Sequence, residues 1–121
     1  MKIHPFIYIC YPFRGGDGRA MKRNIEKACE FGREAYRNGF IPIIPHINSK
    51  AIFGIRGPDK AVTEFDLLLL AECDAMWVCA TKLSKGMRRE VAFCHRHNIP
   101  LVFNLQKVDN LIKEQKRGLK R

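Results

Sequence analysis

The sequence has no long hydrophobic run. Its longest apolar stretch, residues 65–71, is interrupted by Asp66, and a membrane-spanning helix needs about 20 apolar residues. Residues 1–10 carry one Lys and a short apolar segment without a small-residue cleavage site, which indicates a first β-strand rather than a signal peptide. We therefore expect a soluble, cytoplasmic protein that does not enter a membrane.

Paired cysteine motifs are also absent. The five cysteines are scattered and odd in number, which is typical of a reducing compartment. Cys10, Cys79 and Cys94 fall inside strand or helix patterns, where buried thiols behave as small hydrophobes. The histidines, including His46, do not have metal-ligand spacing. We expect neither a metal nor another cofactor.

Acidic residues are few relative to basic ones. The chain has 12 Asp and Glu against 22 Lys and Arg, a formal net charge of +10, which favours anionic partners such as nucleotides. Residues 113–121 predict a basic C-terminal tail after a single domain of residues 1–112. No aromatic residues are interleaved with the charges of the tail, so a solvated helix end is favoured there over nucleic-acid binding.

Short apolar segments alternate with amphipathic ones along the chain. Apolar, β-rich runs predict strands at residues 6–10, 40–44, 75–80 and 101–103. Helical spacing predicts helices at residues 20–38, 60–72 and 86–98, and the Gly- and Pro-containing segment 48–59 is expected to be irregular. This order predicts one three-layer α/β/α domain with a mostly parallel sheet of four to five strands, flavodoxin-like or Rossmann-like. Pro42 places its strand at an edge of the sheet or at a strand end.

The loop after the first strand is rich in glycine. Open parallel sheets bind ligands beyond the carboxyl ends of their strands, and this loop holds Arg14, Gly15, Gly16 and Arg19. Glycines let backbone N–H groups approach an anion, and arginines add bidentate donors for phosphate. The loop matches neither the Walker nor the GxGxxG pattern. An ordinary glycine-rich turn with solvent-facing arginines fits the same residues equally well.

Two carboxylates are candidates for chemistry. Asp66 interrupts an apolar helix, where an acid is costly unless it is partnered or used. Glu90 lies in the first turns of a helix that Ser84 would cap and where Gly86 permits close approach. A glutamate at a helix start often only complements the dipole or pairs with a neighbouring arginine. If the two carboxylates converge at the carboxyl edge of the sheet, one could attack an anomeric carbon while the other handles protons.

The order of these motifs resembles the nucleoside 2-deoxyribosyltransferase superfamily over about residues 6–104. It is most similar to the 2'-deoxynucleoside 5'-phosphate N-hydrolase branch, and it also resembles small phage and bacterial members of that group. The segments that carry the resemblance are YICYPFRGG (8–16), GFIPIIPH (39–46), Asp66-Leu67, CDA (73–75) and the spacing Ser84-x-Gly86-x-x-x-Glu90.

The resemblance implies roles for individual residues. Glu90 would be the nucleophile that forms a glycosyl–enzyme intermediate, Asp66 would assist at the base or sugar, and Tyr8 would position the nucleophile or the sugar. Substrate contacts are implied for Arg14, Gly15, Gly16, Arg19, His46, Ser84 and Gly86. Pro12 stands where the hydrolase branch has a phosphate-binding Ser, which removes one hydroxyl. A homodimer or larger homo-oligomer is also implied.

We therefore expect cleavage of the N-glycosidic bond of a (deoxy)nucleoside 5'-monophosphate, with water resolving the glycosyl–Glu90 intermediate. Two alternatives stay open. A deoxyribosyltransferase acting on free nucleosides would exchange bases faster than it hydrolyses them and would not need a 5'-phosphate. A non-catalytic nucleotide-binding domain on the same fold would bind without turnover.

Overall fold

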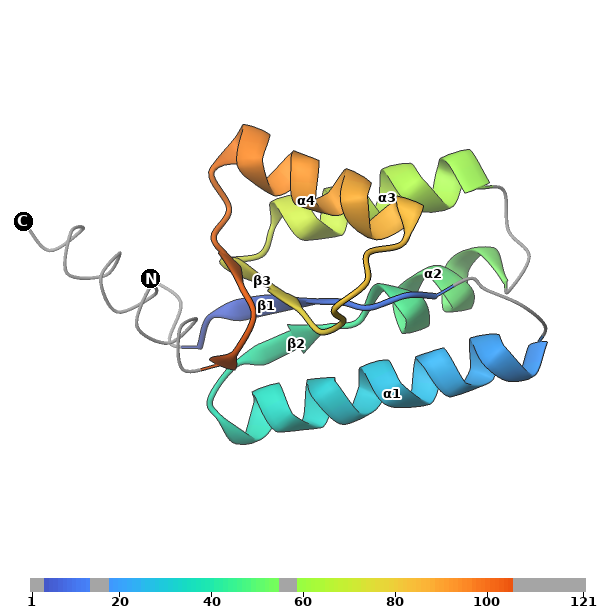
Figure 1. Ribbon diagram of the computed structural model, residues 1–121, viewed down its shortest axis with the longest axis horizontal. Coiled ribbons are helices and arrows are strands. Elements are labelled where there is room, and N and C mark those ends of the chain that lie inside the picture. The colour runs from blue at the N-terminus through green and yellow to red at the C-terminus, as the bar shows by residue number, and fades with distance from the viewer. Residues whose placement is uncertain (1–3, 14–17, 55–58, 106–121) are drawn as a thin grey trace, which may run out of the picture.

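Strands and helices alternate along the chain (Figure 1). The computed structural model describes residues 4–13, 18–54 and 59–105. Its elements are β1 (Phe6–Cys10), α1 (Gly18–Arg37), β2 (Ile41–Ile43), α2 (Pro45–Phe53), α3 (Asp59–Ala71), β3 (Ala75–Val78), α4 (Lys85–His97) and β4 (Leu101–Val102). The predicted α/β fold class is confirmed, and the bounds of the three predicted helices agree within two residues. The proposed tail at 113–121 lies outside the described residues.

The four described strands form a fully parallel sheet in the order β2-β1-β3-β4. β1 is central, so that Tyr8 pairs with Ile43 on one side and with Met76 on the other. The chain passes from β1 to β2 on one side and later returns to the opposite side of β1 as β3. The strand order therefore reverses between β1 and β3. The crevice beyond the carboxyl ends at such a reversal is where open α/β sheets bind ligands.

Helices cover both faces of the sheet, with α1 on one side and α3 and α4 on the other (Figure 1). Because side chains alternate along a strand, β1 sends Ile7 and Ile9 toward the α1 side. Tyr8 and Cys10 project to the opposite face, into the core formed with α3 and α4. All four side chains are completely buried. Two polar-tipped side chains of the central strand thus face the helices that carry the predicted carboxylates.

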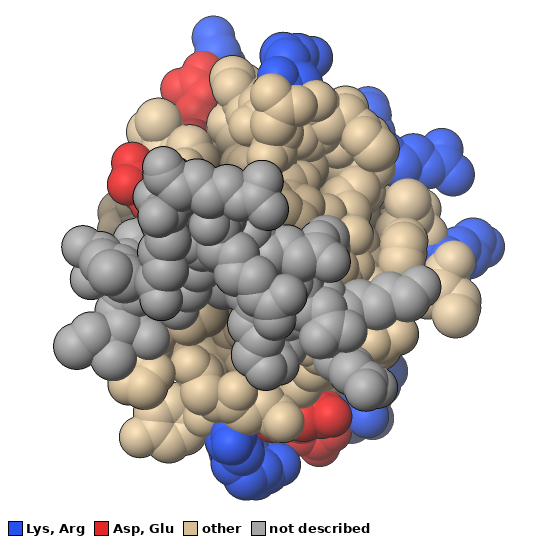
Figure 2. Space-filling view, turned by 90° about the vertical axis from the view of Figure 1, so that its left-hand side faces the viewer, with Lys and Arg blue, Asp and Glu red and all other residues tan. Residues whose placement is uncertain are grey.

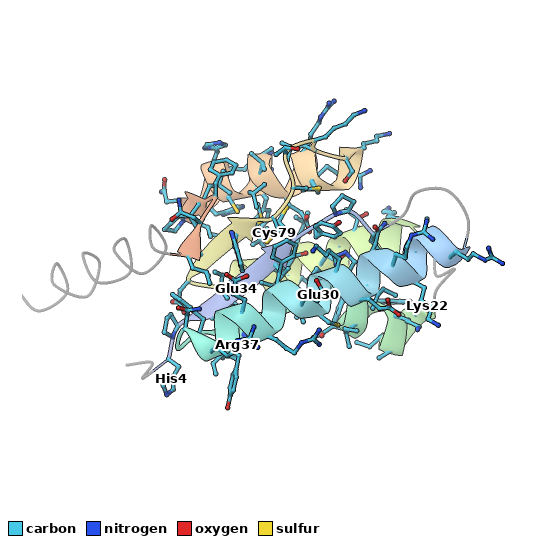
Figure 3. The ribbon with its side chains drawn as sticks, turned by 60° about the horizontal axis from the view of Figure 1, so that its bottom comes forward. His4, Lys22, Glu30, Glu34, Arg37 and Cys79 are labelled. Atoms are coloured by element: carbon cyan, nitrogen blue, oxygen red, sulfur yellow. The ribbon has the colours of Figure 1, made fainter. Side chains whose placement is uncertain are left out.

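α1 packs on the sheet through small residues, namely Ala28, Gly32 and Ala35. A Cβ atom on Gly32 would come within 2.6 Å of Cδ1 of Ile44, so glycine permits close packing of the helix at this point. Glu30, Glu34 and Arg37 lie along the exposed side of the helix, which comes forward in Figure 3. The helix is therefore amphipathic, as its apolar periodicity predicted.

The prediction of an irregular segment at residues 48–59 is wrong in its first part. Pro45 occupies the start of α2, a position that tolerates proline because the missing N–H would be unpaired there anyway. The helix continues to Phe53 and is followed by Gly54, which has a φ of 78°. α2 buries His46 and Ser49, which are three residues apart and so lie on one face. The glycines and proline that suggested irregular structure follow this helix in the sequence.

Two predictions made from single residues, Pro42 and Asn98, are confirmed. Pro42 lies in β2, which is an edge strand of the described sheet. α4 ends at His97, and the next residue, Asn98, adopts the left-handed conformation with φ 57° and closes the helix, as such residues commonly do.

Figure 2 shows the face on which the strands begin, where Lys and Arg side chains project around the outline with a few Asp and Glu between them. The Lys and Arg side chains of the described residues that are visible in this view stand apart and do not form one patch. Within the described ranges, no helix combines the length and apolar character that crossing a bilayer demands.

Candidate active site

A pocket of about 290 Å³ lies beyond the carboxyl ends of the strands. Its walls come from the chain after β1, the start of α2, the middle of α3 and the first turns of α4. Its polar and charged lining residues include His46, Thr63, Asp66, Ser84, Arg89 and Glu90. The pocket therefore lies where the reversed strand order predicts a ligand site.

Glu90 of α4 lines this pocket and is held from behind by β1. The hydroxyl of Tyr8 donates a hydrogen bond to Oε2 of Glu90. The Sγ atom of Cys10 lies 3.6 Å from Oε1 and donates its S–H to that oxygen. Because Tyr8 and Cys10 are two residues apart on a strand, they project on the same face. Each carboxylate oxygen of Glu90 therefore has its own donor.

The position of Glu90 makes its ionisation costly. Burial raises the pKa of Glu90 from 4.5 to about 7; the hydrogen bond from Tyr8 opposes this rise, and the charge of Asp66 adds to it. Burial, followed by the negative charge of Glu90, raises the pKa values of Tyr8 and Cys10 well above their ordinary range. Both groups therefore remain protonated near neutral pH and can donate to the ionised carboxylate.

Asp66 of α3 is the second carboxylate of the pocket. The buried hydroxyl of Ser49 on α2 donates a hydrogen bond to Oδ1 of Asp66. Burial raises the pKa of Asp66 from 3.8 to about 6, and the hydrogen bond from Ser49 opposes that rise. As pH increases, Asp66 therefore ionises before Glu90, and its negative charge then hinders the ionisation of Glu90. Between about pH 6 and pH 7 the pair therefore carries one proton, which rests mainly on Glu90.

His46 provides an aromatic wall beside the carboxylates. Its ring is buried, with its centroid 5.1 Å from that of Phe13 and 6.4 Å from that of Tyr11. Nε2 donates to the carbonyl oxygen of Pro12 at 3.1 Å. Burial lowers the pKa of His46, so that at neutral pH Nδ1 carries a lone pair, and it has no hydrogen-bond partner in the part of the chain that the structure describes. The pocket thus contains aromatic surface and a buried acceptor.

The start of α4 forms the opposite rim. The Ser84 side chain accepts a hydrogen bond from the backbone N–H of Met87 at 3.2 Å, which caps the helix as predicted. Beside it, a Cβ atom on Gly86 would meet no other atom within 4 Å. Nη1 of Arg89 donates to the hydroxyl of Thr63 at 2.9 Å, which joins α4 to α3 across the rim. A helix N-terminus with adjacent basic groups suits an anion.

The predicted site residues differ in how the structure places them. Tyr8, His46, Asp66, Ser84, Gly86 and Glu90 come together, five of them in the pocket lining and Tyr8 directly behind Glu90. Arg19 is exposed at the start of α1 and is not among the described lining residues. The predicted contacts Arg14, Gly15 and Gly16 lie outside the described residues.

The sequence did not predict the roles of Cys10 and Ser49 beside the two carboxylates. Cys10 lies in the core, as predicted, but its contact with Glu90 was not predicted, although its two-residue spacing from Tyr8 indicates the same strand face. Ser49 was overlooked because α2 was not predicted, and a helix beginning at Pro45 would have placed it on the same face as His46. Among the described residues, no three His, Cys, Asp or Glu side chains are grouped so that they could hold a metal ion.

The fold and the site define a class of protein: a parallel α/β domain with a carboxyl pair in a pocket at the point where the strand order reverses. The profile of one protein family, described as a domain of unknown function (DUF7768), matches residues 5–104. The chain belongs to this family. A comparison with curated proteins gives no match.

Proposed function

We propose that this protein cleaves the N-glycosidic bond of a (deoxy)nucleoside 5'-monophosphate, with Glu90 as the nucleophile. The observation that carries the proposal is the placement of Glu90. Its carboxylate lines a pocket with Asp66 and is fixed by hydrogen bonds from Tyr8 and Cys10. A partly buried, oriented carboxylate beside a second carboxyl group is the arrangement used in glycosidic chemistry.

In the first step an oxygen of ionised Glu90 forms a bond to C1′ of the sugar as the bond from C1′ to the base nitrogen breaks. The electron pair of that bond stays on the base, which takes a proton from the carboxyl group of Asp66 and leaves. In the second step water attacks C1′, Asp66 takes its proton, and Glu90 departs as a carboxylate. The net reaction is nucleotide and water to free base and sugar phosphate, and Asp66 regains its proton for the next cycle.

The mechanism uses one of the two singly protonated forms of the carboxyl pair. The pKa values of Asp66 and Glu90 are raised to about 6 and about 7, so between these values the pair carries one proton, which Glu90 holds in the major form. The minor form, in which the proton lies on Asp66 and Glu90 is ionised, supplies the acid and the nucleophile. We therefore expect a bell-shaped pH dependence of kcat/KM with its maximum between the two apparent pKa values.

The walls of the pocket suit the parts of a nucleotide. Tyr11, Phe13 and the His46 ring offer aromatic surface for a base. The capped start of α4 with the open space at Gly86 suits a phosphate. A volume of about 290 Å³ is at the small end of ligand pockets, which favours a single nucleotide over a longer chain.

Chromatographic product analysis tests the proposal. Purified protein is incubated with ribo- and deoxyribonucleosides and their 5'-monophosphates, with and without a second free base. We expect the wild type and the exposed-residue control Glu26→Gln to release free base from monophosphates. Glu90→Gln should release none. Base exchange on free nucleosides would instead identify a transferase. Nucleotide binding without any product would refute the enzymatic proposal and leave a binding domain.

Substitution at Gly86 tests the phosphate position separately. Because a Cβ there meets no protein atom within 4 Å and alanine is the better helix former by about 1 kcal/mol, Gly86→Ala should not destabilise the fold. If phosphate approaches this backbone, Gly86→Ala raises KM for the monophosphate and leaves activity on the free nucleoside, if any, unchanged. An unaltered KM for the monophosphate would place the phosphate elsewhere.

A further inference from the structure

The thiol of Cys10 contacts the candidate nucleophile from a completely buried position. Tyr8 and Cys10 project from the same face of β1, and each donates to a different oxygen of Glu90. Cys10 is 0% exposed, and its Sγ lies 3.6 Å from Oε1. The thiol therefore fills the wall behind Glu90 without opening onto solvent.

Packing alone does not account for this contact. A thiol that only filled space would be expected to have apolar neighbours, but here the sulfur faces an oxygen of an ionisable carboxyl group. Its pKa is raised first by burial and then by the charge of Glu90, which keeps the S–H proton in place. The S–H group is a weak donor and the phenol of Tyr8 is a stronger one. The two oxygens of Glu90 are therefore unequally hydrogen-bonded.

We propose that Cys10 is a positioning residue: its S–H bond to Oε1 of Glu90, together with the O–H bond of Tyr8 to Oε2, fixes the carboxylate plane and tunes its basicity. On the proposed function, which this step assumes, Oε1 is the attacking oxygen. The stronger donor withdraws charge from Oε2, whereas the weaker one orients Oε1 and leaves it more nucleophilic. The bond to C1′ then forms from Oε1 as the glycosidic electron pair leaves with the base.

Other groups also act on Glu90 and must be kept constant in any test. They are Tyr8 on β1, Asp66 on α3, Arg89 on α4 and, across the pocket, the His46 ring on α2. The Cys94 thiol on α4 is also near enough for the charge of Glu90 to add to the rise in its pKa that burial causes. Substitutions at Cys10 change none of these side chains. A matched control exists in Cys94, which is equally buried in the same core but whose Sγ pairs with Sδ of Met76 at 3.9 Å. Cys94→Ala removes a buried thiol of the same size that is not bonded to Glu90.

The first test is a carbon-13 NMR titration of the Glu90 carboxyl group, assigned by its loss in Glu90→Gln. Removal of the donor in Cys10→Ala should raise the pKa of Glu90 by about half a unit or more. Cys10→Ser, which restores a donor, should bring the pKa of Glu90 back toward the wild-type value. Cys94→Ala should leave the pKa of Glu90 unchanged. Equal pKa values in wild type and Cys10→Ala, or equal rises in the Ala and Ser variants, would overturn the proposal.

A second readout uses the wild-type chain and does not require a Cys10 variant to fold. The infrared S–H stretching band of Cys10 should move to lower frequency as Glu90 ionises, and this movement should be lost in Glu90→Gln. An S–H stretching frequency of Cys10 that does not change with pH would overturn the proposal. Neither measurement needs turnover, so a positive result in a protein that releases no base would support the positioning role and refute the proposed function.

Discussion

Glu90 should destabilise the folded protein at neutral and alkaline pH, and its removal should stabilise it. The pKa of Glu90 rises from 4.5 to about 7 on folding, chiefly through burial. The folded state therefore holds the proton more tightly than the unfolded state. The resulting contribution to stability is fully present below about pH 4.5, and it is lost as pH rises through about 7.

The size of this destabilisation follows from the shift in the pKa of Glu90. Each pKa unit corresponds to roughly 1.4 kcal/mol, so a shift from 4.5 to about 7 gives at most about 3.5 kcal/mol. Glu90 is only partly buried as a residue because it lines the pocket, and solvent there reduces the penalty. We expect Glu90→Gln to gain about 1 to 3 kcal/mol in free energy of unfolding relative to wild type between about pH 4.5 and pH 8.

Urea denaturation at a series of pH values measures this difference. Glu26→Gln, which removes an exposed carboxylate from α1, is the control and should show a difference from wild type that barely changes with pH. A gain in Glu90→Gln that is the same at every pH would reflect packing of the amide and not the cost of burying a charge. A variant less stable than wild type at about pH 8 would refute the reasoning outright.

Three further changes have defined outcomes. Ser49→Ala removes the donor to Asp66 and should raise the pKa of Asp66 above about 6, as an NMR titration would show; an unchanged pKa would contradict the assigned hydrogen bond. Ser84→Ala removes the cap of α4 and should cost about 1 kcal/mol in urea denaturation; no loss of stability would contradict the assigned cap. Asn98 has a φ of 57°, so Asn98→Ala should be less stable than Asn98→Gly by about 1 kcal/mol in thermal unfolding; equal stability would contradict the left-handed end of the helix.

Local patterns were sufficient for most of the element order. The apolar runs of the four strands and the helical spacing between them predicted all but one of the described elements. The sequence does not predict α2, because Pro45 fits the end of a strand as well as the first position of a helix. The short apolar segment offers little periodicity by which to decide between the two.

The candidate site was predictable only in part. Sequence neighbours identified Asp66 and Glu90 as candidates: Asp66 interrupts an apolar run, and Glu90 follows a capped helix start. Their hydrogen-bond partners Ser49 and Cys10 could not be identified in this way, because each hydrogen bond joins residues that are far apart in the chain. One bond connects β1 with α4 and the other connects α2 with α3.

The sequence by itself determined that strands and helices alternate, that Pro42 lies at an edge of the sheet or at a strand end, and that Ser84 caps a helix, since each follows from local backbone and side-chain chemistry. The tertiary structure decided the strand order β2-β1-β3-β4, the pocket at its reversal, and the raised pKa values of Asp66 and Glu90. These depend on which distant segments pack together and how much water they exclude, and desolvation of a charge exists only once the chain has folded around it.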